Sequence, residues 1–430
     1  MLTESGYLNG ARALPEVSIR RHGGRMDLKA RLALLKGHRG PSAASTGSAR
    51  PTISERVQRL SVRPRLKRTD IDDEAIASRL QGQAIAPGLI RIERRVPLEQ
   101  LPGCVGSIRS AFPPLALLTD GAAVEPEEIL FIDTETTGLA GGTGTLPFLL
   151  GLARINGAEL HLCQWFLTGF RGEAALLEDA RSWYGQARQV VSFNGKGFDV
   201  PLLSTRYRLA RSADPLSALE HLDLLHPTRR AFGRRWPDCR LQTAERELLA
   251  FERADDLPGH LIPEVWTTFV RSGIFTHVPR ILHHNVLDLM GLIGLLSMLV
   301  RVYAEPGFAD SDPHAIARGF RRRRHETIAY QCLCDRSERL DTAGLMELAD
   351  LHRRHGVWAS AVPIWTRLAT EGHLRALERL AKYYEHVCRD HPMALIWTDR
   401  LLDLQVQGQQ HQRRKARLVE RIKAIRQSQD

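Results

Sequence analysis

Residues 129–138 read ILFIDTETTG, a short apolar run that leads into two acidic residues two positions apart. The apolar run predicts a buried β-strand. Residues i and i+2 of a strand point to the same face, so Asp133 and Glu135 should aim their carboxylates at one spot. Neighbouring carboxylates repel each other, and a divalent cation such as Mg²⁺ relieves that repulsion by binding their oxygens. A strand that simply ends in a polar turn, with Gly138 at positive φ, is the alternative that this stretch leaves open.

Similar apolar runs follow along the chain and predict the fold class. Runs that are typical of strands lie at 147–155, 160–167 and 189–193. Helical patterns are found at 173–184, 198–210, 240–251 and 282–302. Short links between the first three strands favour an antiparallel meander, after which strands alternate with helices. The sequence therefore predicts an α/β fold, a sheet covered by helices.

A second polar segment, SFNGKGFD at 192–199, follows a predicted strand and begins a helix. Asp199 lies in the first turn, where the helix dipole favours a carboxylate, and it can project toward the sheet. Asn194 is placed to position a ligand, and Lys196 is either a contact to that ligand or a solvated side chain. An ordinary helix start with an acid in its first turn is the alternative.

The third segment is HHNVLD, residues 283–288, at the predicted start of an apolar helix. A buried carboxylate at Asp288 would be costly unless it is paired or bound to a metal ion. His284 precedes Asp288 by four residues and shares its helical face, whereas His283 would come from the turn before. Beside such a carboxylate, His284 is a candidate general base, and a satisfied polar residue is the alternative.

Together and in this order, DTETTG, FNGKGFD and HHNVLD resemble the three exonuclease motifs of the DEDD 3′-to-5′ exonucleases, which have an RNase H-like fold. The segments GLAGGTGTLPFLLGLARI (138–155), HLDLL (221–225) and LQTAERELLAFERADDLPGHLIPEVW (241–266) are similar to the YprB-type branch of that group. The resemblance covers roughly 125–305. It implies an RNase H-like mixed sheet flanked by helices.

The resemblance also assigns roles to residues. It implies that two Mg²⁺ or Mn²⁺ ions are bound by the four acids Asp133, Glu135, Asp199 and Asp288. His284, favoured over His283, would be the general base of a two-metal hydrolysis of phosphodiester bonds. Asn194 and Lys196 would contact the substrate, the 3′ end of single-stranded DNA or RNA. We consider a non-catalytic nucleic-acid-binding or scaffold protein as the alternative, although a scaffold would not need four matched carboxylates.

Two further acidic segments in the same region have alternative interpretations. Asp223, within HLDLL, either supports the metal-binding acids or simply ends a strand. The resemblance places Arg253, Asp255 and Asp256 at the rim of the active site. A salt-bridged loop that ends at the Pro258-Gly259 pair explains the same residues, and we favour it.

The C-terminal region shows an internal repeat in which Ala349 and Trp365 recur as Ala381 and Trp397, each 32 residues later. A period near 33 with small residues on paired helices is typical of tetratricopeptide-type hairpins, and an ordinary helical bundle is the alternative. The expected organisation is a disordered basic arm at 1–70 and a lead-in segment at 71–125. An exonuclease domain at 126–305 and a helical repeat domain at 315–430, with a possible protein partner, would follow.

Charge and composition are consistent with a nucleic-acid enzyme of the cytoplasm. The net charge is +11, of which residues 1–70 carry +10 and residues 411–430 carry +5, so that the remainder is slightly acidic. Such basic blocks contact polyanions or lie solvated, and the cluster RGFRRRR at 318–324 either extends a nucleic-acid surface or links two domains. No apolar run is long enough for a membrane span, the best being 289–300. Six cysteines without a CxxC pair favour a reducing compartment, and Cys332 and Cys334 are expected to be core thiols.

Overall fold

The computed structural model describes residues 71–103, 116–119, 124–138, 144–404 and 408–428. The basic arm predicted for 1–70 and its expected disorder lie outside the described residues. So do residues 139–143 of the glycine-rich stretch that follows the first motif.

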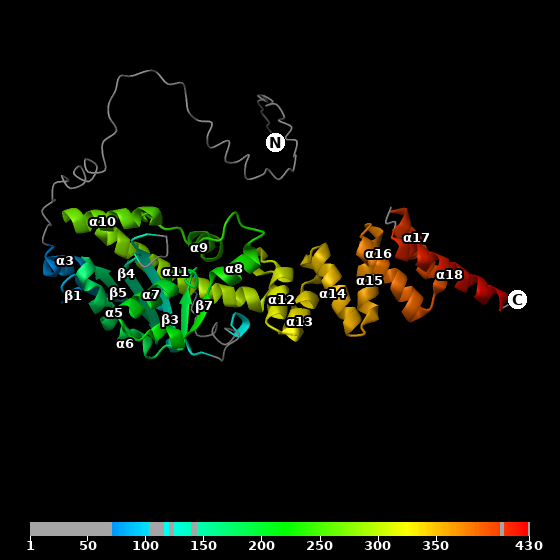
Figure 1. The fold of residues 1–430 in the computed structure, drawn as a ribbon, viewed down its shortest axis with the longest axis horizontal. Coiled ribbons are helices and arrows are strands. Elements are labelled where there is room, and N and C mark those ends of the chain that lie inside the picture. Colours follow the sequence, from blue (N-terminus) through cyan, green and yellow to red (C-terminus); the bar gives the residue numbers. More distant parts are fainter. Residues whose placement is uncertain (1–70, 104–115, 120–123, 139–143, 405–407, 429–430) are drawn as a thin grey trace, which may run out of the picture. The chain divides into compact units, whose positions relative to one another are not determined.

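Within the described residues, seven strands form one mixed sheet (Figure 1). They are β1 (Gln83–Ala86), β2 (Leu89–Pro97), β3 (Ile129–Thr136), β4 (Pro147–Asn156), β5 (Glu159–Leu167), β6 (Gln189–Ser192) and β7 (Glu220–Asp223). Their spatial order is β1-β2-β5-β4-β3-β6-β7. β3, β4 and β5 form the predicted antiparallel meander, while β6 pairs with β3 and β7 with β6 in parallel. The predicted α/β fold is confirmed.

Three strands of the sheet, β1, β2 and β7, were not among the runs predicted as strands, although a strand that ends at Asp223 was one alternative for that residue. β1 and β2 come from the segment 71–125, and β2 pairs along its whole length with β5. β2 was not recognised because only its first half is apolar and buried. The exposed residues Glu93, Arg94 and Arg95 interrupt the apolar pattern of its second half. β1 is only four residues long, too short for a periodic pattern.

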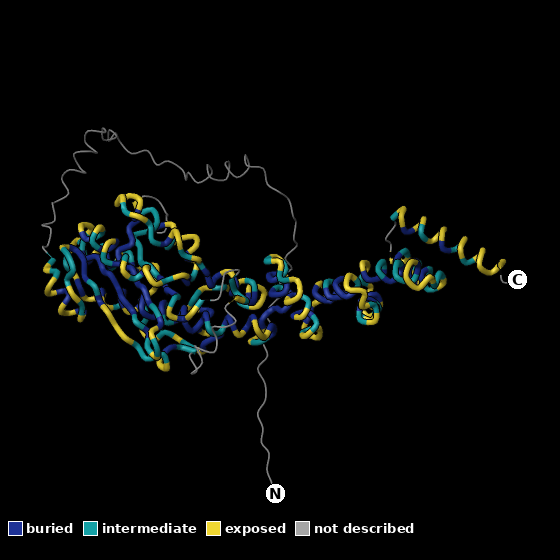
Figure 2. Tube along the Cα trace, turned by 90° about the horizontal axis from the view of Figure 1, so that it is seen from below, coloured by how far each residue is buried: buried dark blue, intermediate teal, exposed yellow. Residues whose placement is uncertain are grey.

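Helices of the N-terminal and central parts cover the sheet (Figure 1). They are α3 (Asp73–Leu80), α5 (Glu173–Asp179), α6 (Arg181–Tyr184), α7 (Asp199–Leu209), α8 (Leu225–Phe232), α9 (Leu241–Leu249), α10 (Ile262–Ser272) and α11 (Val278–Ala304). Alternate residues of β3 enter two different cores: Ile129 and Phe131 pack with α8 and α9, Leu130 and Ile132 with α5, α7 and α10. The central strands β4, β5 and β6 are buried along most of their length (Figure 2). Buried on both faces, β3 is held firmly up to the point where Asp133 and Glu135 begin.

Helix α11 differs from the prediction at its start. It begins at Val278, with Pro279 in its first turn, so Asp288 lies well inside the helix rather than at its opening. His283 and His284 are therefore both helical, and they face different ways: His283 is exposed and His284 is buried. With 27 residues, α11 is long and apolar enough to cross a membrane, but 72% of its most apolar window is buried within the protein. It is a core helix, as predicted for 289–300.

The C-terminal region is helical throughout its described residues, as predicted. It consists of α12 (Pro313–Arg322), α13 (Glu326–Asp335), α14 (Thr342–Arg354), α15 (Trp358–Thr370), α16 (Leu374–Tyr383), α17 (His391–Asp403) and α18 (Gln409–Gln427). From α12 onward each helix packs against the next. The repeated Ala349 and Ala381 are fully buried in α14 and α16, and Trp365 and Trp397 are buried in α15 and α17. These positions support a repeated helical pair, and its assignment to the tetratricopeptide type stays a prediction.

The arginine cluster at 318–324 is not a solvated linker. Most of it belongs to α12, which packs against α8. Arg321 pairs with Glu326 and with Glu347 of α14, and Arg323 donates hydrogen bonds to the backbone carbonyls of Leu117 and Thr119. These two arginines therefore fasten the fold, whereas Arg318, Arg322 and Arg324 are exposed.

A buried histidine also joins α12 to α14. His314 Nε2 lies 3.0 Å from Glu347 and its Nδ1 lies 3.2 Å from Asp341, the residue before α14. The hydrogen bond to Glu347, together with the charge of Asp341, raises the pKa of His314 above its usual value. The hydrogen bond from His314, together with the hydrogen bond and charge of Arg321, lowers the pKa of Glu347 to about 2.

The basic C-terminal helix α18 is held by one buried acid. The carboxylate of Glu385 is fully buried and lies 3.2 Å from Arg414 and 2.6 Å from Arg417. Arg421 approaches the same carboxylate at 3.9 Å. Otherwise α18 buries little, and most of its surface is exposed (Figure 2). Arginines of the basic block 411–430, which we expected to contact polyanions or lie solvated, thus attach α18 to the rest of the protein.

Replacing Glu385 by alanine should loosen α18. The substitution removes the shared partner of three arginines, one of them nearly buried, at a cost of about 2 kcal/mol of local stability. We expect faster amide hydrogen exchange in 409–427, with exchange in β3, β4 and β5 unchanged. Glu420→Ala is the matched control, because Glu420 is an exposed acid of α18 that pairs with Lys423 at the surface. Unchanged exchange in the Glu385→Ala protein would contradict this account.

The contacts of His314 predict a pH-dependent stability. Because its pKa is raised on folding, the folded chain holds this proton more tightly than the unfolded chain does. The stabilisation is complete below about pH 6.5 and is lost as the pH rises through the raised pKa. We expect His314→Gln to reduce the free energy of unfolding, measured by urea denaturation, more at pH 6 than at pH 9. His226→Gln, at an exposed position of α8, is the control, and an equal loss at both pH values for His314→Gln would refute the prediction.

Candidate active site

Asp133 is held in place by a chain of amide side chains at the end of β3. Asn285 of α11 donates a hydrogen bond of 2.7 Å to Oδ2 of Asp133, and Gln164 of β5 donates one of 2.7 Å to Asn285. Gln164 and Asn285 are fully buried. A Cβ at Gly151, the residue of β4 opposite Asp133, would come within 2.2 Å of Asn285 Oδ1. Three elements thus fix one oxygen of Asp133.

Asp199 is the first residue of α7, as predicted, and it lies beside β3. The hydroxyl of Thr134, between the two acids of the first motif, donates a hydrogen bond to its carboxylate. The turn before α7 is held by Asp223, whose buried carboxylate accepts hydrogen bonds from the backbone N–H groups of Asn194 (2.7 Å) and Lys196 (3.0 Å). Asp223 therefore ends a strand and supports the turn that leads to Asp199.

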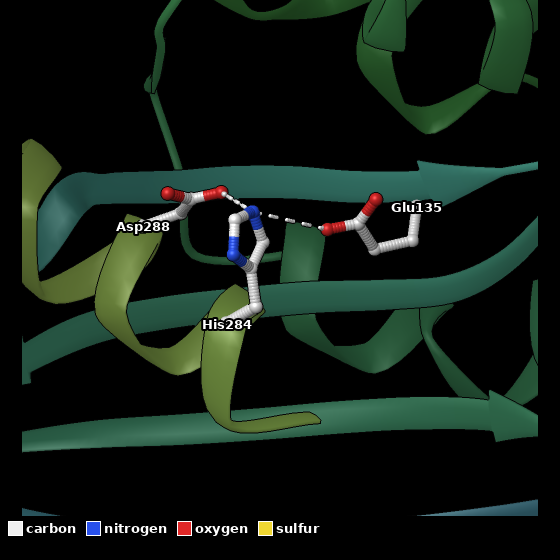
Figure 3. A group of neighbouring side chains, drawn as sticks. All are labelled: Glu135, His284 and Asp288. Atoms are coloured by element: carbon white, nitrogen blue, oxygen red, sulfur yellow. Dashed lines mark ion pairs between the residues drawn. The ribbon is translucent and has the colours of Figure 1, made fainter. Parts of the chain in front are cut away.

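The third motif contributes His284 and Asp288 from one face of α11 (Figure 3). Nε2 of His284 lies 3.4 Å from Asp288 Oδ2 and 3.7 Å from Glu135 Oε1. These three side chains offer atoms that all lie within 4.8 Å of one another, an arrangement that could hold a metal ion. His283, the alternative general base, is exposed.

Arg253 lies against the acidic cluster and carries several ion pairs. Its nearly buried guanidinium lies 2.5 Å from Asp288 Oδ1 and 2.6 Å from Glu245 Oε1. It also contacts Asp256 at 3.2 Å, whereas Asp255 is 94% exposed and pairs at the surface. The loop is salt-bridged, as we favoured, and it also reaches the site, because Arg253 contacts Asp288 and Asp256 contacts His284.

Burial and mutual repulsion determine the electrostatics of the cluster. Burial, together with the charges of Asp288 and Asp199, raises the pKa of Asp133 well above its usual range. Burial and the charge of Asp133 do the same for Glu135. Burial raises the pKa of Asp199 to about 6 in spite of the hydrogen bond from Thr134. Carboxylate oxygens are the ligands that suit a hard divalent cation, and a bound cation would remove this repulsion.

A cavity of about 550 Å³ opens beside the cluster. Its wall includes Asp133, Glu135 and Asp199. Asn194 also lines it, whereas Lys196 is exposed and is not part of its wall. Of the two residues expected to contact substrate, the structure thus brings only Asn194 to the cavity.

Several residues of the site were missed from the sequence. Gln164 is the one polar residue in the run LCQWFL, a signal that something polar must lie opposite. Asn285, between two histidines and an apolar helix, gave the same signal. Thr134 and Glu245 gave no such signal in the sequence, because a threonine in a strand and a glutamate in a helix are common.

Comparison with known proteins agrees with this architecture. A family model described as RNase H superfamily matches residues 130–300. YprB of Bacillus subtilis strain 168, itself described as uncharacterized, is 32% identical over 278 residues, which cover 62% of this chain and 67% of YprB.

A solved structure, the family B DNA polymerase of the hyperthermophilic archaeon Pyrobaculum calidifontis, is 14% identical with a TM-score of 0.33. The similarity covers 59% of this chain and 34% of the polymerase, and it is too slight to support a conclusion. The residues that the family model matches contain all three motifs. The chain belongs to the YprB-type family of RNase H-like proteins.

Proposed function

We propose that this chain is a metal-dependent 3′-to-5′ exonuclease that hydrolyses phosphodiester bonds of single-stranded DNA or RNA. The observation that carries the proposal is the convergence of Asp133, Glu135, Asp199 and Asp288 from one strand and two helices, with His284 between them. Burial and neighbouring carboxylates raise the pKa of Asp133 and of Glu135, so the convergence of these acids is costly without a cation, and cation binding is the simplest reason for it.

In this proposal each residue has a defined task. The four acids would hold two Mg²⁺ or Mn²⁺ ions, which when bound stabilise the attacking hydroxide and the leaving oxygen. Nε2 of His284 would accept the proton of the attacking water. Asn285 keeps one oxygen of Asp133 occupied and so orients the other.

Substrate would enter through the cavity beside the cluster. Asn194 lies in its wall, at the turn that Asp223 holds. Lys196, exposed next to that turn, would contact the phosphates of the bound strand, an attraction that weakens with salt. A cytoplasmic location and a protein partner of the helical repeats remain predictions.

Degradation of end-labelled single-stranded DNA and RNA with Mg²⁺ or Mn²⁺ tests the proposal. We expect stepwise shortening from the 3′ end that EDTA abolishes. Asp133→Asn should lower the rate by about a thousandfold, since metal-assisted stabilisation is worth several kcal/mol. Asp310→Asn, a matched change at an exposed acid that pairs with Arg235, should leave the rate unchanged. Binding of nucleic acid without hydrolysis under either metal would instead favour the non-catalytic alternative.

Asn285→Ala should weaken ion binding without removing any acid. Asp133 would lose its hydrogen-bond donor, and Gln164 would lose its hydrogen bond to Asn285 while keeping the one to the carbonyl of Leu282, so we expect ion affinity to fall by about 10- to 100-fold. Titration calorimetry with Mn²⁺ measures this directly. Asn156→Ala, at the exposed last residue of β4, is the matched control. Equal affinities for Asn285→Ala and wild type would show that Asn285 does not orient Asp133 for the ion.

A further inference from the structure

The ring of His284 is held from the side opposite the acidic cluster. Its Nδ1 lies 2.7 Å from Oδ1 of Asp256, and both side chains are 9% exposed. An ionised carboxylate can only accept a hydrogen bond, so Nδ1 must carry the hydrogen. In the neutral ring Nε2 then bears the lone pair, and Nε2 is the atom that faces Glu135 and Asp288.

Asp256 is itself fixed by other side chains. Its second oxygen, Oδ2, accepts hydrogen bonds of 3.2 Å from Arg253 and from Gln242. Arg253 is anchored in turn by two hydrogen bonds to Glu245, whose side chain is fully buried. A Cβ at Gly291 of α11 would come within 2.0 Å of Glu245 Oε1, so the absence of a side chain at this glycine leaves room for the carboxylate of Glu245. The position of Asp256 is thus set by the packing of α9 on α11.

We propose that Asp256 is a positioning residue that fixes the orientation and tautomer of His284, so that the lone pair of Nε2 faces Glu135 and Asp288. The inference rests on the proposed function, in which Nε2 accepts a proton. A ring that carries its hydrogen on Nε2 has no lone pair on that atom and cannot accept a proton there. Catalytic histidines lose activity in this way when their partner carboxylate is changed to an amide.

The substitution Asp256→Asn makes a specific structural prediction. Arg253 donates to the Oδ2 position and would select the oxygen of the amide, which turns the NH₂ group toward His284. An NH₂ group donates to Nδ1 and so stabilises the tautomer with the hydrogen on Nε2. Asp255→Asn is the matched control, since Asp255 is the neighbouring residue, is 94% exposed, and has a positive φ of 56° that asparagine tolerates.

Nitrogen-15 NMR of histidine-labelled full-length protein, with saturating Mg²⁺ and no substrate, reads the ring directly. The His284 signals are identified by their loss in His284→Gln. We expect the hydrogen on Nδ1 in wild type and in Asp255→Asn, and on Nε2 in Asp256→Asn. On single-stranded substrate, Asp256→Asn should lower kcat by about a hundredfold with KM within about twofold, because general-base catalysis is lost while binding is kept.

Two results would overturn the inference: a wild-type ring without its hydrogen on Nδ1, or an Asp256→Asn protein that keeps both the wild-type tautomer and kcat. The first result is decisive even where the variant does not fold. If wild type hydrolyses no substrate, the proposed function fails, while the ring measurement still decides whether Asp256 fixes His284.

Discussion

The repulsion among four carboxylates at the end of β3 is the constraint on which the rest of this site depends. Asp133, Glu135, Asp199 and Asp288 are brought together against their mutual charge, and burial increases the cost. Partial compensation comes from Arg253, which pairs with Asp288, and from Asn285, which donates to Asp133. The two cores on either face of β3 supply the rigidity that keeps these acids from moving apart.

Helix α11 combines structural and chemical roles in one element. Its apolar residues fill the core beneath the sheet, and Asn285, His284 and Asp288 project from it toward the end of β3. Gly291 makes room for Glu245 and Gly151 of β4 makes room for Asn285, so two small residues allow the polar network to lie between packed elements. The helix resembles a membrane span in composition because it is buried almost all round.

The sequence predicted the parts of the molecule that depend on local pattern. The strands β3, β4 and β5, the start of α7 at Asp199 and the helical nature of the C-terminal region follow from periodicity, turn residues and spacing. It did not predict β2, whose pairing with β5 stabilises a strand that is half charged. The ion pair of Arg253 with Asp288 joins residues 35 positions apart, and no local pattern announces such a contact. The start of α11 was placed too late because the segment before the motif was not recognised as helical, although Pro279 in the first turn is typical of a helix start.

The central claim is that the four acids bind divalent cations, and diffraction from crystals soaked in Mn²⁺ tests it most directly. The account predicts anomalous peaks within coordination distance, about 2.0–2.3 Å, of carboxylate oxygens of Asp133, Glu135, Asp199 and Asp288. It also predicts that Asp288 then contacts the ion in place of Arg253. Well-ordered crystals with no peak at this cluster, while Asp288 stays paired with Arg253, would contradict it.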